Sequence, residues 1–302
     1  MKKLFSHPCS LVVFRETQRM VKQSIFGVFG GVFILGAQVL CSEDKVDLTL
    51  KFEPGKTYVS ESVISQKSAI PMMGETSVEM KILTAQTASQ EGENVKVVQK
   101  SKSVKMDISM AGVKSSLDSE DPDSLDPSNP IAGLLSGLMN VSSTIQLSPK
   151  GEIISVEAES APGMETMGFG EVELKQSARE LFDMLPSKSV AIGESWESES
   201  KMPLPEMFKD DVVVKYTHTF KGMEKVDGHE LAKIVYTGKI DEKDENLSVT
   251  SKKIGGEILF DAKIGQPRKV TTESEIVIGL AEGGGMTIPM TSKSMMTLKE
   301  IK

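Results

Sequence analysis

Histidine is the first side chain to consider, because its ordinary pKa alone lies between pH 5 and 8. His218 and His229 are the two histidines beyond the N-terminal segment. His218 alternates in phase with Tyr216 and Phe220 along an expected strand, which predicts a packed position. His229 lies in an expected turn and should face water. A zinc site would need further nitrogen or sulfur ligands, or several carboxylates in their place. The two histidines therefore indicate no catalytic or metal centre.

Nucleophilic and phosphate chemistry have no recognisable motif in this chain. Serines are numerous, but there is no Gly-x-Ser-x-Gly turn and no Ser-x-x-Lys with its supporting motifs. The run Gly283 to Gly285 lacks the Lys-Ser/Thr pair that completes a phosphate-binding loop, so it is predicted to be a hairpin tip. The sequence predicts a protein that is not an enzyme and has no cofactor.

An acidic stretch between Leu117 and Asn129 offers carboxylates that could gather a hard cation such as calcium. Its acids are Asp118, Glu120, Asp121, Asp123 and Asp126. Their spacing differs from the EF-hand pattern, and Pro122 and Pro127 stiffen the chain. The composition predicts a solvated loop outside any sheet, with calcium binding left open as the alternative.

Methionine is frequent in a chain with few aromatic side chains: there are 18 methionines, against 1 Trp and 3 Tyr. Several of them, Met290 included, fall on strand faces that should point inward. Methionine adapts to varied apolar partners. Two interpretations stay open, a methionine-padded core or an adaptable apolar cavity for a lipid-like ligand. The residues expected to line such a cavity are Met80, Met106, Met110, Leu181, Phe182 and Leu185.

One segment in the middle of the chain has helical periodicity. Its apolar residues are spaced as i, i+4, i+7, i+8 and i+11, which is one stripe of a 3.6-residue helix. Pro186 lacks a backbone N–H and ends the pattern. We expect one main amphipathic helix over residues 171–185, with its stripe facing a sheet. The stripe consists of Leu174, Ala178, Leu181, Phe182 and Leu185.

The chain on both sides of this helix alternates with period two, as half-buried antiparallel strands do, for example from Val46 to Phe52. The apolar segment from Ile131 to Met139 is expected to be a short helix. The pattern predicts an α+β fold that is mostly β, with long antiparallel strands in one curved sheet or two related sheets. Its parts would be a first β-rich unit at 42–170 with the acidic loop at 117–129, a linking helix at 171–186 and a second β-rich unit at 187–302.

The two halves share short patterns that suggest an internal duplication. Gly55 to Ser62 and Gly193 to Ser200 have a glycine, an aromatic residue and Ser-Glu-Ser at matching positions. The stretch from Gly92 to Val97 similarly resembles that from Gly228 to Ile234. Chance similarity between meandering strands is the alternative, and superposition of the halves would decide between them.

The N-terminus has the layout of a secretory signal peptide. An uninterrupted apolar run from Ile25 to Ala37 follows five basic residues and a single acid. We therefore expect export to the periplasm or cell envelope, with residues 1–41 as a signal peptide or a retained anchor. A start at Met20 would give a signal of ordinary length. Cys41 is either a cleavage-site residue or a lipidated cysteine, and both alternatives stay open.

Net charge and cysteine content limit the binding partners and the covalent or metal sites that the chain can be expected to have. The formal net charge is −8, and loss of the basic N-terminal segment would make it more negative, which disfavours nucleic acid and anionic membrane surfaces. Both cysteines, Cys9 and Cys41, lie in that segment, so the folded part should hold no disulfide and no cysteine-based metal site. Membrane contact is expected only through the N-terminal segment or a lipidated Cys41.

The order of these signals resembles a family of exported bacterial β-rich proteins known only as a domain of unknown function. The motifs that carry the resemblance cover most of residues 45–300, mark turns and strand ends, and bring no catalytic residue with them. They are Pro54 to Tyr58, the acidic stretch 118–129, the hairpin at Pro149 to Gly151, the helix that ends before Ile192 to Trp196, and Ile258 to Pro267.

Two functions follow as expectations. The first is an exported, non-enzymatic envelope protein that binds a hydrophobic or lipid-like ligand between sheet and helix. The second is a structural or protein-interaction module of the envelope that has no small-molecule ligand and contacts another envelope protein. An unfilled interior would favour the first, and an exposed apolar patch or sheet edge would favour the second.

Overall fold

The computed structural model describes residues 45–70, 74–126, 132–160, 170–202, 212–243, 247–280 and 286–302. The chain divides into two units, residues 1–42 and 43–302. The predicted signal peptide, the glycine run at 283–285 and the end of the acidic stretch at 127–129 lie outside the described residues. The fold described below is that of the larger unit.

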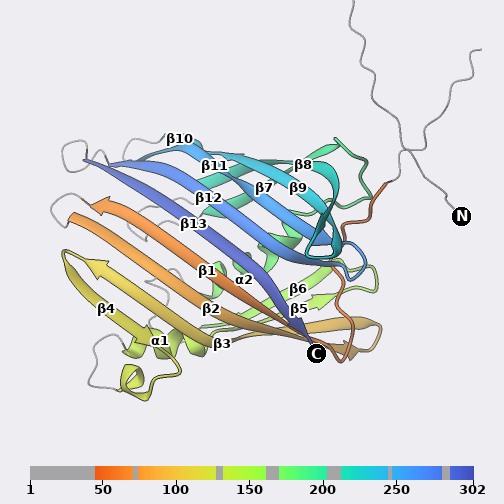
Figure 1. Ribbon diagram of the computed structural model, residues 1–302, viewed down its shortest axis with the longest axis horizontal. Coiled ribbons are helices and arrows are strands. Elements are labelled where there is room, and N and C mark those ends of the chain that lie inside the picture. The colour runs from red at the N-terminus through yellow and green to blue at the C-terminus, as the bar shows by residue number, and fades with distance from the viewer. Residues whose placement is uncertain are drawn as a thin grey trace, which may run out of the picture. The chain divides into compact units, whose positions relative to one another are not determined.

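Within the described residues, the strands form a single antiparallel sheet of 13 strands (Figure 1). Its main path runs β6-β5-β3-β2-β1-β13-β12-β11-β9-β8-β7, while the short strands β4 and β10 pair with β3 and β11. The prediction of a mostly β fold is confirmed, with one sheet rather than two. The strands are β1 Thr57–Ile70, β2 Gly74–Glu91, β3 Asn94–Met110, β4 Val113–Asp118, β5 Ser142–Leu147, β6 Ile153–Glu159, β7 Ser195–Met202, β8 Val212–Val226, β9 His229–Lys239, β10 Asp241–Lys243, β11 Leu247–Asp261, β12 Gln266–Leu280 and β13 Met286–Ile301.

Tight hairpins join many of these strands. Between β8 and β9, Asp227 and Gly228 both have positive φ, 49° and 83°, which is the conformation of the two-residue turn whose twist matches that of paired strands. Asp tolerates this region better than most residues, and glycine adopts it without a steric penalty. The chain can therefore reverse in two residues and continue as the neighbouring strand.

The two β-rich halves of the chain are joined within the sheet, because the first strand, β1, pairs with the last, β13. Each half follows the chain order as a meander, with β1 to β6 on one side and β7 to β13 on the other. The order of strands is thus alike in the two halves. The predicted duplication stays a prediction, which superposition of the halves would test.

Two α-helices and one 3-10 helix complete the described part of the chain: α1 Ala132–Met139, α2 Glu171–Asp183 and η1 Pro122–Leu125. The predicted helices at both places are confirmed. Helix α2 ends two residues earlier than predicted: Met184 is its C-cap, and the Leu185 amide donates to the Phe182 carbonyl in a tighter turn (3.2 Å). Pro186, which follows, cannot donate at all.

The acidic stretch corrects a prediction. Leu117 and Asp118 do not lie in a loop but at the end of β4, and Leu117 is only 1 % exposed. It is buried because α1 packs on this part of the sheet, where Leu117 joins Leu135 and Leu138 in one apolar cluster. After the strand, Asp121 caps η1 by accepting a hydrogen bond from the Asp123 amide (3.1 Å). The acids here serve local structure.

The largest apolar cluster lies beside one end of α2 and combines both halves of the chain. It is built from the segment before β1 and from strands β1, β2, β3, β5, β8, β9 and β11. Phe220, Ile258 and Phe260 are among its fully buried members. Burial of such side chains is worth ~1.5–3 kcal/mol each, so this cluster is the main source of stability. Two smaller clusters lie under α1 and around Val249.

Candidate functional site

Helix α2 lies between the two ends of the strand path. It packs against β5 and β6 at one end and against β7 at the other. Two side chains fix it to β7. The Gln176 amide donates to the Lys201 carbonyl oxygen and to the Ser200 hydroxyl (3.4 Å), and the Trp196 indole N–H donates to the Met184 carbonyl oxygen (3.0 Å). The helix therefore spans the sheet and contacts the strands at both ends of the path.

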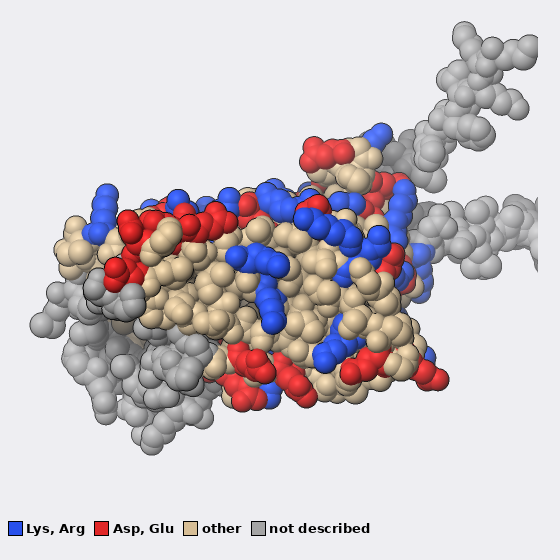
Figure 2. Space-filling model, turned by 90° about the horizontal axis from the view of Figure 1, so that it is seen from below, with Lys and Arg blue, Asp and Glu red and all other residues tan. Residues whose placement is uncertain are grey.

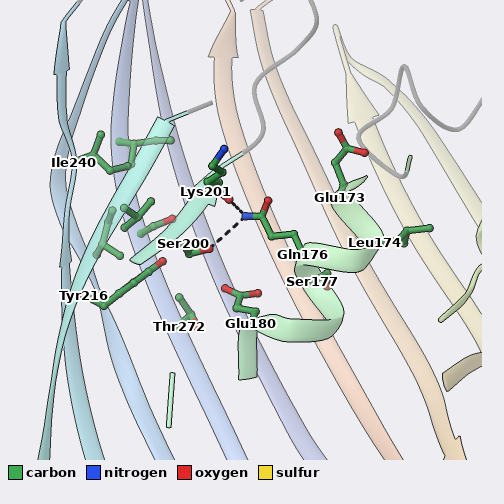
Figure 3. A pocket seen from close by; sticks show the side chains of 14 residues that line it. Glu173, Leu174, Gln176, Ser177, Glu180, Ser200, Lys201, Tyr216, Ile240 and Thr272 are labelled. Atoms are coloured by element: carbon green, nitrogen blue, oxygen red, sulfur yellow. Dashed lines mark hydrogen bonds between the residues drawn. The ribbon is translucent and has the colours of Figure 1, made fainter. Parts of the chain in front are cut away.

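Hollows remain between α2 and the sheet. Three of them adjoin, with volumes of ≈ 380, ≈ 350 and ≈ 310 Å³, and Glu180 lines all three. We call this space the α2 cavity. Each volume falls within the ~300–1,000 Å³ that is usual for small-molecule sites. Figure 3 shows the first hollow, with Gln176 and Glu180 projecting from the helix toward the strands that carry Ser200 and Tyr216.

The space stays open because the sheet is lined there by small side chains. Strands β1, β2, β12 and β13 present serine and threonine to the cavity, and such side chains are too short to reach the helix. Strand pairing brings them together, since Ser60 lies opposite Thr84 and Thr272 lies opposite Ser294. The small polar residues that line the cavity are Ser60, Ser62, Thr84, Thr272, Ser274 and Ser294.

A glycine in β11 shapes the same wall. Tyr236 lies opposite Gly256, and its hydroxyl passes over that glycine to donate to the Thr271 carbonyl oxygen (2.9 Å) and to meet the Thr272 hydroxyl (2.6 Å). A Cβ at position 256 would overlap the Thr271 carbonyl oxygen and come within 2.6 Å of the Tyr236 hydroxyl. The missing side chain thus allows the tyrosine to lie across the strand.

The opposite part of the cavity is apolar. Leu181 and Phe182 of α2 face Met296 and Leu298 of β13 across the second hollow. The Phe182 ring stacks against Phe52 with centroids 6.3 Å apart and an angle of 26°. Leu181 and Phe182 are only half-buried, so the cavity leaves apolar surface accessible. The site combines an apolar part with a hydroxyl-rich part.

Several charged side chains line the α2 cavity, and Glu180 is the acid common to all three hollows. Glu180 is an exposed residue, yet the protein around its carboxyl raises the pKa of that group, with a further increase from the charge of Asp183. Burial also raises the pKa of Tyr236 to about 12, and the negative charge of Glu180 adds to that increase. The pKa of Tyr216 is raised for the same two reasons. Glu180 and the two tyrosines therefore share one electrostatic environment.

His218 has the packed position that the sequence predicts. It is 0 % exposed and stacks on Trp196 with ring centroids 5.5 Å apart. Its Nε2 shares a hydrogen bond with the Ser198 hydroxyl (2.9 Å), while its Nδ1 has no partner within the described residues. Burial lowers its pKa to about 4, so the ring is neutral at pH 7. A serine-histidine pair is present, but among the described residues no acid orients the histidine as in a catalytic triad.

The predicted lining residues divide among several places. Leu181 and Phe182 line the α2 cavity, whereas Leu185 lines only a further hollow of ≈ 450 Å³ at the end of the helix, which Phe182 also lines. Met80 and Met106 belong to the cluster under α1. The prediction that Met110 points inward is wrong, because it is 48 % exposed at the end of β3, where the chain turns into β4.

The sequence interpretation missed the polar half of the site. Glu180 and Ser177 lie beside the apolar stripe of α2, and Ser60 and Ser62 occupy one face of β1. The available signal was a strand face made of serine where an inward face should be apolar. Period-two alternation alone could not show it, because the opposite face of β1 also carries polar residues such as Glu61.

Metal and membrane features complete the description. In the described ranges, no group of three or more His, Cys, Asp and Glu side chains is arranged to hold a metal ion. Calcium binding by the acidic stretch stays untested, since its last residues lie outside those ranges. None of the helices within the described part of the chain has the length and apolar character needed to cross a bilayer.

Residues 162–274 match the model of a family described as a family of unknown function, DUF6263. The match runs from just before α2 to within β12 and confirms the resemblance to a domain of unknown function. No curated protein matches the chain.

Comparison of structures gives distant similarities. A candidate exported protein with a YmcC-like fold from Bacteroides fragilis is 11 % identical with a TM-score of 0.26, covering 86 % of this chain and 100 % of its own. A candidate lipoprotein from Parabacteroides distasonis is 10 % identical with a TM-score of 0.26 and the same coverage, 86 % and 100 %. DynF of the dynemicin pathway of Micromonospora chersina is 10 % identical with a TM-score of 0.21, covering 86 % and 88 %. Scores this low assign neither fold nor function to this chain.

Proposed function

We propose that this chain is an exported, non-enzymatic protein of the cell envelope that binds a hydrophobic or lipid-like ligand in the α2 cavity. The observation that carries the proposal is the unfilled space between α2 and the sheet, lined by half-buried Leu181 and Phe182 on one side and by short polar side chains on the other. Small-molecule sites commonly combine apolar walls with a few polar groups that fix orientation.

The packing of the cavity also supports a binding role. Here the hollow volumes of ≈ 380 and ≈ 350 Å³ lie under a helix that is itself fixed at both sides. A chain of methylene groups placed against Leu181, Phe182 and Met296 would gain ~0.8 kcal/mol for each CH₂ that leaves water.

Export is supported by the N-terminal segment alone. The apolar run from Ile25 to Ala37 after basic residues predicts secretion. A lipid-like ligand suits an envelope location, where such molecules are abundant and must be shielded from water.

The first test is binding of the apolar dye N-phenylnaphthylamine, which is uncharged at neutral pH, to residues 43–302. We expect a saturable rise in dye fluorescence for the wild-type protein. Ser177→Phe places a ring in the first two hollows and should weaken binding about tenfold, since the occupied space is no longer available. Native mass spectrometry of protein purified from envelopes should show a copurified lipid-like mass.

Ser136→Phe is the matched control, because Ser136 is an exposed residue of α1. It makes the same chemical change on another helix and should leave dye binding unaltered. Absence of saturable binding by the wild-type protein, or equal loss in both variants with unchanged unfolding temperature, would contradict a ligand site under α2.

One observation favours the second candidate, a protein-interaction module. Met110 and Val113 flank the turn between β3 and β4 and are 48 % and 70 % exposed. Two neighbouring apolar side chains at a hairpin tip could contact an envelope protein. On the face seen in Figure 2, acidic residues gather at the margins and uncharged residues fill much of the middle. Loss of a crosslinked partner on Val113→Ser, with dye binding absent from the wild type, would favour this role over ligand binding.

A further inference from the structure

The α2 cavity has a charge pattern that can select the head group of its ligand. Glu180 is the acid that lines all three hollows. It lies on the turn of α2 next to Leu181 and Phe182, which form the apolar part of the second hollow. A single ligand could therefore contact the carboxylate with one end and the apolar side chains with the other.

Within the described part of the chain, Glu180 forms no ion pair. The cations on its own helix have other partners: Lys175 pairs with Glu171, and Arg179 lies 4.0 Å from Asp183. Asp183, one turn further along the same helix, adds negative charge rather than neutralising Glu180. The protein around this exposed carboxyl raises its pKa, so an incoming cation would stabilise its charged form, which no cation of the described residues does through an ion pair.

The strands that face Glu180 provide oxygen atoms for such a cation. Tyr216 of β8, Ser200 of β7 and Thr272 of β12 line the first hollow with it, and Figure 3 shows their side chains in this space. An ammonium group has three N–H donors and needs several acceptors. Tyr216 and Tyr236 stay un-ionised near neutral pH, because burial raises the pKa of each hydroxyl. Tyr216, which lines the first hollow, therefore adds a hydroxyl oxygen without competing for the charge, whereas the Tyr236 hydroxyl is already bonded to Thr271 and Thr272.

We propose, on the premise that the α2 cavity binds a lipid-like ligand, that this ligand is an amphipathic cation whose ammonium head pairs with Glu180 while its hydrocarbon chain lies against Leu181 and Phe182. An anionic head is disfavoured beside Glu180 and Asp183. Lys201 and Glu173 also line the first hollow, and the third is lined by both cations and acids, so the test must distinguish an anion placed near a cation. The charged residues of the third hollow besides Glu180 are Lys175, Arg179, Lys201, Asp183 and Glu199.

The experiment is displacement of bound N-phenylnaphthylamine at pH 7.5 by three amphiphiles with the same twelve-carbon chain: dodecylammonium, dodecanol and dodecanoate, all below their micelle-forming concentrations. For the wild-type protein we expect dodecylammonium to displace the dye at an about tenfold lower concentration than dodecanoate. Glu180→Gln should abolish this preference while dodecanol binding persists. Thermal unfolding is recorded for every variant.

Glu171→Gln is the matched control, because it removes the same formal charge from the same helix at an exposed residue paired with Lys175. It should leave the preference for dodecylammonium intact. Equal loss in both variants, or a wild-type protein that prefers dodecanoate or distinguishes none of the three, overturns the head-group proposal. No dye binding at all overturns the proposed function itself. The three-ligand comparison on the wild type stays decisive even if a variant fails to fold.

Discussion

The large apolar cluster and the α2 cavity lie on the same sheet but differ in the size and polarity of the side chains that the strands contribute. In the cluster, strands contribute full-sized side chains such as Phe220, Ile258 and Phe260, all 0 % exposed. Under the middle of α2, the same sheet contributes serine and threonine, and the helix residues above them are half-buried. Stability is concentrated in one region, which allows the other to remain unfilled.

The difference is chemical as well as steric. The cluster packs apolar side chains against one another, whereas the first hollow of the cavity holds Glu173, Glu180 and Lys201 beside hydroxyl groups. Tyr236 belongs to both regions: its ring packs in the cluster and its hydroxyl reaches the Thr272 side chain at the cavity wall. Four perturbations test this difference between the cluster and the cavity.

The largest expected effect is in the cluster. Phe260→Ala should lower the free energy of unfolding by ~3–5 kcal/mol, because it removes a fully buried ring and leaves a void. Phe182→Ala removes the same ring from a half-buried position at the edge of the cluster, where water can enter from the cavity, and should lower the free energy of unfolding by only about 1–2 kcal/mol. Urea unfolding measures the free energy of unfolding of both variants. Dye binding should change in the opposite order, with Phe182→Ala weakening it more. Equal destabilisation would mean that the cavity is as tightly packed as the cluster.

The second perturbation is acidification, which should affect the packed region through His218. Its pKa is about 4 in the folded protein against an ordinary 6.5, because burial disfavours the charged ring. The unfolded chain therefore binds the proton first, and stability is lost as pH falls from 6.5 to about 4. The difference between the two pKa values corresponds to a loss of roughly 3 kcal/mol in the free energy of unfolding near pH 4.

The variant pair for this effect is His218→Gln and His229→Gln. His229 is exposed at the start of β9, so its replacement should leave the pH dependence as in the wild type. His218→Gln lowers stability at all pH values by removing a packed ring, but its unfolding free energy should change less between pH 6.5 and 4. A wild-type slope in His218→Gln would show that other groups cause it.

The boundary between the two regions can be tested at Gly256. Alanine there would overlap the Thr271 carbonyl oxygen and press on the Tyr236 hydroxyl, so the free energy of unfolding should fall by ~1–3 kcal/mol. Gly133→Ala in α1 is the control, since no atom lies within 4 Å of the added Cβ. Alanine favours a helix over glycine by up to about 1 kcal/mol, so this variant should be at least as stable as the wild type. If Gly256→Ala is as stable toward unfolding as the Gly133→Ala control, Tyr236 does not need the space over β11.

Sequence alone predicts the helices and strands of this fold better than the tertiary contacts between them. Alternation and the helical stripe identify β strands and α2, because both are local patterns. The cavity depends on register between distant strands, such as Ser62 opposite Met296, which no local pattern specifies. The burial of Leu117 has the same cause, since it depends on α1 folding back onto β4. Glu180 resembles any polar residue of an amphipathic helix until the strands that face it are known.

The smallest expected effect comes from the cavity charge. The pKa of Glu180 is raised by burial and by Asp183, so the folded protein binds this proton more tightly than the unfolded chain does. Its contribution to stability is therefore complete below the ordinary pKa of 4.5 and is lost as pH rises through the higher folded value. Glu180→Gln keeps the shape without the ionisation, so it should match the wild type at pH 4 and exceed its unfolding temperature at pH 8. Glu171→Gln, which breaks an ion pair with Lys175, should give no such gain. A wild-type protein as stable as Glu180→Gln at pH 8 would mean that the carboxylate is well solvated. The cavity would then lack the unsatisfied charge that distinguishes it from the apolar cluster.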